Sequence, residues 1–120
     1  MTAWPKQSQM NAFYGNPDAN GDGVADLKWQ QDNLTTIVPP YPMFYDGKPV
    51  RKITCHKKIA VALLECLTEI GQVMTPAEIK QYALGEFGGV FNFRKKRAGS
   101  SLSTHAYAAA IDLAVRLNPF

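Results

Sequence analysis

The sequence lacks long apolar runs, has few cysteines and carries little excess charge. No apolar run approaches the ~20 residues that a membrane-spanning helix needs, so we expect no membrane span. Its 2 cysteines form no CxxC pair or Cys/His cluster, which gives no sign of a thiolate zinc site and fits synthesis in a reducing compartment. The net charge of +3 suits an anionic partner, either a cell wall or a nucleic acid.

What is present indicates a single domain. A chain of 120 residues with 46% hydrophobic content is long enough for one modest core. The first residues, from Met1 to Lys6, are followed by polar residues and not by the apolar stretch of a signal peptide. Positive charge gathers in the run RKKR at residues 94–97, which lacks interleaved aromatics. We therefore expect a solvated basic patch there and no nucleic-acid partner.

Local patterns predict an α+β chain. Asp46-Gly47 is typical of a hairpin turn, and Thr75 with Glu78 is typical of a capping box. Thr54 is a candidate N-cap for the clearest helix, in which Ile59, Leu63, Cys66, Leu67 and Ile70 share one face. The predicted elements are helices at 5–14, 56–70 and 75–84, strands at 33–38, 50–54, 90–93 and 109–115, a hairpin at 41–49 and a polar loop at 94–104.

The chemistry of the chain concentrates in residues 99–113, where Ser103, His105 and Asp112 follow one another. His and Asp are common zinc ligands. In one helix, a spacing of seven residues would separate the two side chains by about 10 Å along the axis. In one strand, an odd spacing would point them to opposite faces. A shared metal therefore requires a bend, with His105 on a loop or strand end and Asp112 on a following strand.

Each of these residues also has a simpler interpretation. His105 could be an ordinary loop histidine, and Ser103 ordinary loop polarity. Asp112 stands between apolar residues, where a carboxylate without a counter-charge is costly. That cost favours a cation beside it, although Arg94 or Arg116 could supply the charge instead.

In this segment the sequence resembles a known family. Ser103, His105, Ala110 and Asp112 match the S-x-H-x-x-G-x-A-x-D signature of the zinc peptidoglycan peptidases. That group contains the VanY-type D-alanyl-D-alanine carboxypeptidases and the phage endolysins that cut L-alanyl-D-glutamate bonds. The similarity extends along nearly the whole chain, through residues 4–5, 13–17, 37–40, 56–58, 87–94 and Gly99.

The resemblance implies a fold, a cofactor and residue roles. The family fold is α+β, a small antiparallel sheet with flanking helices (DD-peptidase/hedgehog-like). His105 and Asp112 would bind zinc, and Ser103 would hold the substrate peptide. Arg94 would bind a substrate carboxylate or stabilise an oxyanion. His56, the other histidine, is a weak candidate for a third ligand, and a structural role fits it better.

The chain departs from the family pattern at two places. Ala108 stands where the motif has glycine, so we expect its backbone to avoid the conformations that only glycine reaches easily. The family's third zinc ligand is a His in a C-terminal W-G-G-x-W…D-x-M-H segment, which also holds the general base. The chain ends at Phe120 without it, so residues 1–120 resemble the N-terminal portion of the domain, with the C-terminal part missing.

The resemblance therefore implies a phage-type zinc hydrolase of peptidoglycan, in a truncated or split form. It would be made in the host cytoplasm without a signal peptide and act on the cell wall after release. A C-terminal segment or second chain would complete the zinc site, and the isolated chain would bind zinc weakly. One alternative is a catalytically inactive wall-binding module of the same fold.

A second candidate metal site lies near the N-terminus. Asp18, Asn20, Asp22 and Gly23 fit the first half of a calcium loop, D-x-[DN]-x-[DN]-G. Trp29 occupies the position of the usual bidentate Glu, and Asp26 could compensate in part. The bound ion would be a structural Ca2+. A third hypothesis for the whole chain is an interaction domain centred on this loop, and the simpler interpretation of the loop is a polar turn.

Overall fold

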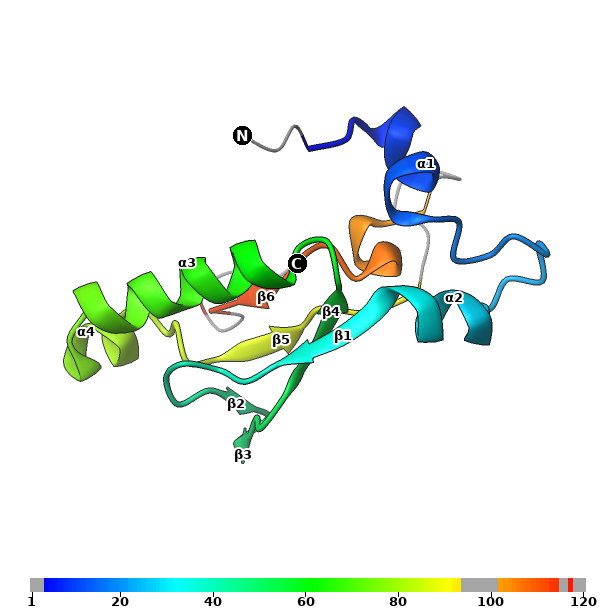
Figure 1. Cartoon of the computed structure of the whole chain (residues 1–120). Coiled ribbons are helices and arrows are strands. Elements are labelled where there is room, and N and C mark those ends of the chain that lie inside the picture. Colours follow the sequence, from blue (N-terminus) through cyan, green and yellow to red (C-terminus); the bar gives the residue numbers. More distant parts are fainter. Residues whose placement is uncertain (1–3, 94–101, 115–116, 118–120) are drawn as a thin grey trace.

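The computed structural model describes residues 4–93, 102–114 and 117, and it confirms the α+β class (Figure 1). The strands found among these residues form three two-stranded antiparallel sheets. No helix in the described ranges is long and apolar enough to cross a membrane. The elements are η1 (Gln7–Gln9), α1 (Met10–Tyr14), α2 (Leu27–Asn33), β1 (Leu34–Ile37), β2 (Phe44–Tyr45), β3 (Lys48–Pro49), β4 (Ile53–His56), α3 (Ala60–Val73), α4 (Pro76–Gln81), β5 (Phe87–Gly89), η2 (Thr104–Tyr107) and β6 (Asp112–Leu113).

The central sheet pairs β1 with β4 in the register Leu34 opposite His56 and Ile37 opposite Ile53. In the stretch of chain that connects β1 to β4, β2 and β3 form the predicted hairpin, with Asp46 (φ 49°) and Gly47 (φ 78°) at its turn. Positive φ at both central residues is the conformation that favours an Asp-Gly pair in a two-residue hairpin. This part of the prediction is confirmed because its signal is local.

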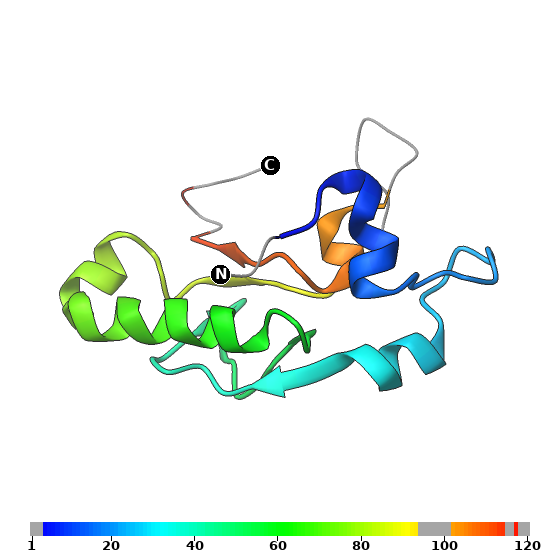
Figure 2. The same cartoon turned by 45° about the horizontal axis from the view of Figure 1, so that its top comes forward.

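Helix α3 lies along the central sheet (Figures 1 and 2) and buries Leu67 in the main hydrophobic core. The predicted apolar face is confirmed except for Cys66, which is exposed. The predicted start is wrong, because Thr54 belongs to β4 and the N-cap is Ile59. Pairing with β1 holds residues 53–56 as a strand and delays the helix to Ala60. The two cysteines, Cys55 on β4 and Cys66 on α3, are both free.

The N-terminal helical segment packs in a second cluster. The predicted helix at 5–14 is a 3-10 turn, η1, followed by α1, and Pro5 lies before both. Met10 and Tyr14 are buried against Ala106 and Tyr107 of η2. The apolar face of α1 therefore supports the turn that carries His105.

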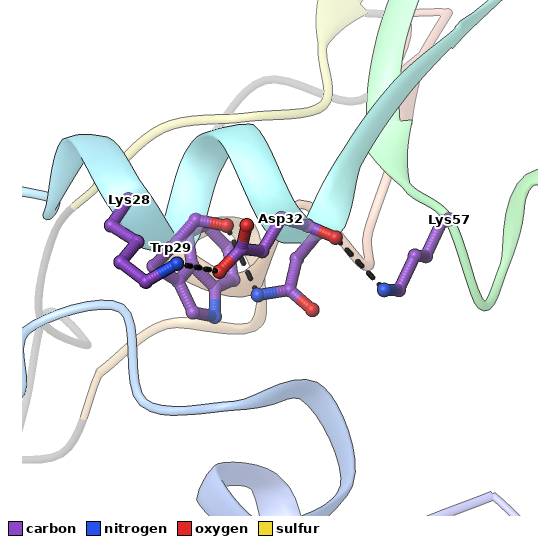
Figure 3. A network of polar contacts seen from close by, with 5 residues as sticks. Lys28, Trp29, Asp32 and Lys57 are labelled. Carbon is purple, nitrogen blue, oxygen red and sulfur yellow. Dashed lines mark hydrogen bonds and ion pairs between the residues drawn. The ribbon is translucent and has the colours of Figure 1, made fainter.

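Helix α2 was missed by the sequence analysis. Trp29 is its buried residue, and the indole Nε1 donates to the carbonyl of Tyr14 at 3.0 Å. On the exposed side, Lys28 Nζ pairs with Asp32 Oδ2 at 3.0 Å, and Lys57 Nζ donates to the Asp32 carbonyl at 2.8 Å (Figure 3). The i,i+4 pair of Lys28 and Asp32 is a helical signal that the sequence does contain.

The C-terminal half confirms one predicted feature and corrects two. Thr75 caps α4 in a capping box with Glu78, as predicted, although the helix ends at Gln81. The predicted strand at 90–93 is wrong, because the strand is β5 at Phe87–Gly89. The predicted strand at 109–115 is reduced to β6, at Asp112–Leu113. Most of the predicted polar loop, residues 94–101, lies outside the described residues.

Candidate metal centre

His105 lies on the 3-10 turn η2, which begins with a side-chain cap. Ser103 is the N-cap, and its Oγ accepts a hydrogen bond from the His105 backbone N at 3.2 Å. The His105 carbonyl then accepts from Asn92 N at 3.0 Å. These bonds hold the backbone N and the carbonyl of His105, and they thereby set the direction in which the imidazole leaves the backbone.

The chain reverses at Ala108, directly after η2. Ala108 has φ 56° and ψ 35°, in the left-handed region, and it is fully buried. Our expectation that this position avoids glycine-type conformations is wrong. The Ala108 carbonyl accepts from His56 N at 2.9 Å, and this bond to β4 helps to hold a conformation that an alanine adopts only at a cost. The reversal then leads the chain to β6.

Asp112 is placed by the pairing of β6 with β5. Asp112 lies opposite Gly89 and Leu113 opposite Phe87, with an irregular register between them. Gly89 has φ 119°, a conformation suited to glycine at a bulge. The next residue, Val90, uses its carbonyl oxygen to hold His105 Nδ1 at 2.8 Å. One segment, residues 87–90, therefore positions both candidate ligands.

The bend predicted between His105 and Asp112 is present, and the two side chains meet. His105 Nε2 lies 3.2 Å from Asp112 Oδ1, with the side chains 11% and 28% exposed. A carbonyl oxygen only accepts hydrogen bonds, so the contact with Val90 places a proton on Nδ1. The lone pair of Nε2 then faces the Asp112 carboxylate, so a metal ion between the two atoms would accept a lone pair from each.

The two donor atoms, a histidine nitrogen and a carboxylate oxygen, have the types and the spacing that zinc requires of its ligands. With bonds of about 2.1 Å, a tetrahedral zinc ion separates a nitrogen and an oxygen ligand by about 3.4 Å, close to the 3.2 Å between His105 and Asp112. A second ring nitrogen bonded to a backbone carbonyl is the usual support of a zinc-bound histidine. The sequence could not name Val90 as that partner, because any residue type carries a backbone carbonyl.

A third protein ligand is missing from this arrangement. Among the described residues, the one group of three or more His, Cys, Asp or Glu side chains that could hold a metal is Asp18, Asp22 and Asp26. The residues outside the described ranges are of none of these four types. Cys55 is buried, and burial raises the pKa of its thiol, which disfavours the thiolate that a metal needs.

His56 is part of the core and cannot serve as the third ligand. Its Nδ1 accepts from Lys58 N at 3.1 Å, and its Nε2 lies 2.8 Å from the Tyr14 carbonyl. Burial lowers the pKa of His56; the Tyr14 bond opposes this shift, and the charges of Lys58 and Lys57 add to it. The ring is thus a neutral link between β4 and α1, as the structural interpretation expected.

The other predicted site residues have different outcomes. Ser103 is buried and caps η2, a role that the sequence analysis did not foresee. Its hydroxyl hydrogen remains a donor. Arg94 and Arg116, the two arginines considered as alternative partners of Asp112, both lie outside the described residues.

A groove of about 510 Å³ lies beside the His105 turn. It is lined on one side by Thr104 and residues 109–111, and on the other by η1, α1 and α3, including Met10, Tyr14 and Leu63. Neither His105 nor Asp112 lines it. The groove is therefore a neighbour of the candidate metal centre and no part of it.

The calcium-loop residues come together in part. One carboxylate oxygen each from Asp18, Asp22 and Asp26 lie within 4.8 Å of one another. Asn20 uses its side-chain oxygen to accept from Asp22 N at 3.1 Å. This loop leads from α1 to α2 and projects from one end of the molecule, in blue at the right of Figure 1.

Comparisons of the chain with protein-family models, with curated proteins and with solved structures give no match.

Proposed function

We propose that this chain is the ligand-bearing part of a zinc-dependent peptidoglycan peptidase of the DD-peptidase/hedgehog-like fold. The substrate is an L-alanyl-D-glutamate or D-alanyl-D-alanine bond of the bacterial cell wall. The observation that carries the proposal is the 3.2 Å approach of His105 Nε2 to Asp112 Oδ1, with Val90 fixing the imidazole from behind. A third ligand and the general base come from a further segment or a second chain.

Each residue has a defined part in this proposal. A zinc ion held by His105 and Asp112 supplies Lewis-acid activation of water and of the scissile carbonyl. Ser103 keeps η2 in place through its bond to the His105 backbone and has a hydroxyl hydrogen left for a substrate carbonyl. Arg94 binds a substrate carboxylate, for which its planar guanidinium is suited.

A calorimetric zinc titration of the chain tests the proposal. We expect one weak site, and an affinity lowered roughly tenfold or more by His105→Asn and by Asp112→Asn, because each removes one of two ligands. Asp32→Asn is the matched control, since Asp32 is an exposed acid paired with Lys28. A wild-type chain that binds no zinc, or that keeps its zinc affinity after both substitutions, would rule out His105 and Asp112 as zinc ligands.

The second candidate function is an inactive wall-binding module, favoured by the absence of a third protein ligand from the described residues and of His, Cys, Asp and Glu from the rest. A turbidity assay on purified cell walls distinguishes the two. We expect little lysis from the chain alone and lysis when a segment bearing a histidine and an acid is supplied. Wall binding without lysis in both samples would favour the module.

A further inference from the structure

The hairpin of β2 and β3 is exposed along its whole length. Every residue from Phe44 to Pro49 is exposed, and the hairpin lies at the lower edge of the molecule in Figure 1. It carries two aromatic side chains, with Phe44 44% and Tyr45 56% exposed. Because successive side chains on a strand point to opposite faces, both faces of the hairpin are open to solvent. These rings therefore leave apolar surface available to a partner.

The position of the hairpin is fixed at its base. Met43, the residue before β2, is buried in the main hydrophobic core, and its carbonyl accepts from Val50 N at 2.9 Å. Phe44 N donates to the Gly85 carbonyl at 2.7 Å. An ordered element therefore presents the two aromatic rings, so that little conformational entropy is lost when a partner binds them.

Positive charge lies beside these aromatic side chains. Lys48 is directly opposite Tyr45 in the hairpin, and Arg51 and Lys52 follow β3; all three basic residues are exposed. None of them forms an ion pair or a side-chain hydrogen bond with another residue that the structure describes. Residues 44–52 contain these three basic residues and one acid, a net charge of +2 in a chain whose net charge is +3. The partner that complements this surface is therefore anionic.

We propose that the hairpin of β2 and β3 binds the surface of an anionic lipid bilayer. The rings of Phe44 and Tyr45 enter the headgroup region, where aromatic side chains are favoured, and the tyrosine hydroxyl stays on the aqueous side. The three basic side chains lie against the anionic headgroups, and each adds to binding. The chain lies on the bilayer and does not span it. This proposal is independent of the zinc site.

The shape of this surface favours a bilayer over an anionic polymer. A single strand of nucleic acid is typically held in a positively charged groove, with its bases stacked on aromatic side chains. The groove next to the hairpin, of about 790 Å³, has Phe44 in its lining but none of the three basic residues. Charge and aromatic surface instead gather on a projecting element that is exposed on both faces, which suits contact with a broad, flat surface.

Co-sedimentation of the full chain with lipid vesicles tests the proposal. The probes are vesicles of phosphatidylcholine alone and vesicles of an equal mixture of phosphatidylcholine and phosphatidylglycerol. We expect the anionic vesicles to bind the chain roughly tenfold more tightly than the neutral ones, and high salt to weaken this binding. Tyr45→Ser and Lys48→Gln should each lower the affinity for the anionic vesicles roughly fivefold.

Matched controls come from other parts of the surface. Tyr82→Ser removes a 48% exposed tyrosine that follows α4, and Lys28→Gln removes a lysine of α2 whose side chain is 87% exposed. Neither residue belongs to the hairpin, so both variants should bind the anionic vesicles as the wild type does. Far-UV circular dichroism should be the same for all four variants, because each replaced side chain is exposed.

Absence of binding to the anionic vesicles, or equal binding to both kinds of vesicle, would overturn the proposal. Unchanged affinity in Tyr45→Ser and Lys48→Gln would place the contact elsewhere on the chain. A larger loss with Lys95→Gln than with Lys48→Gln would assign it to the basic run at residues 94–97. Binding to purified cell walls or to single-stranded DNA, with none to vesicles, would identify the partner as an anionic polymer.

Discussion

At the scale of single residues, the two histidines differ in the partner of one ring nitrogen, because each uses its other nitrogen to contact a backbone carbonyl. His56 has both ring nitrogens bonded to the protein, to Tyr14 and Lys58. His105 has one nitrogen bonded to Val90 and the other facing Asp112. The chemistry available to each imidazole therefore depends in part on the carbonyls of Tyr14 and Val90, which come from distant segments. Residue types do not encode such backbone contacts.

The buried imidazole of His56 makes stability depend on pH. Its pKa in the folded chain lies below its usual 6.5, mainly because of burial, so the unfolded chain binds a proton first as pH falls. Its contribution is complete above about pH 6.5 and is lost as pH falls from there through the folded-state pKa. We expect the midpoint urea concentration of the wild type to decrease when the pH is lowered from 8 to 5.5.

The matched variant is His56→Gln, which removes the titrating group. It should be less stable than the wild type at pH 8, because it loses a buried ring, but its urea midpoint should fall less toward pH 5.5. Equal pH slopes for the two proteins would show that other groups cause the dependence.

At the scale of elements, the capping box of α4 offers a direct test of a local signal. Thr75 Oγ1 accepts from Glu78 N at 3.2 Å, and Glu78 Oε1 accepts from Thr75 N at 2.9 Å. Thr75→Ala should lower the free energy of unfolding by about 1 kcal/mol, measured by urea denaturation. Thr68→Ala is the control, since this half-buried threonine lies inside α3, where its hydroxyl donates to the Leu64 carbonyl and caps nothing; a loss as large there would contradict the capping explanation.

Elements with local signals were predicted well, and elements defined by distant partners were not. The hairpin turn at Asp46-Gly47 and the cap at Thr75 depend on neighbouring residues, and both are confirmed. The start of α3 depends on the pairing of β4 with β1, and β5 depends on β6. The bend between His105 and Asp112 was predictable because, at a spacing of seven residues, the two side chains could not share a metal ion within a single helix or strand. The conformation of Ala108 was not predictable.

At the scale of the molecule, two hydrophobic clusters meet next to the candidate metal centre. The larger contains β1, β4 and α3 residues around Leu67, and the smaller joins α1 to η2 through Met10, Tyr14 and Tyr107. Ile59 packs against both clusters, and the ring of His56 lies 4.9 Å from that of Tyr14. The turn that bears His105 is therefore supported from both clusters.

This arrangement predicts that the two clusters unfold together. Ile59→Ala should lower the free energy of unfolding by about 2 kcal/mol, since it removes apolar contacts with both clusters, while Val61→Ala should change it by less than about 0.5 kcal/mol because Val61 is 69% exposed. Tryptophan fluorescence and far-UV circular dichroism should give coincident transitions in the wild type. Two separate transitions would mean that the α1–η2 cluster is an independent unit, and His105 would then lose its support before the central sheet unfolds.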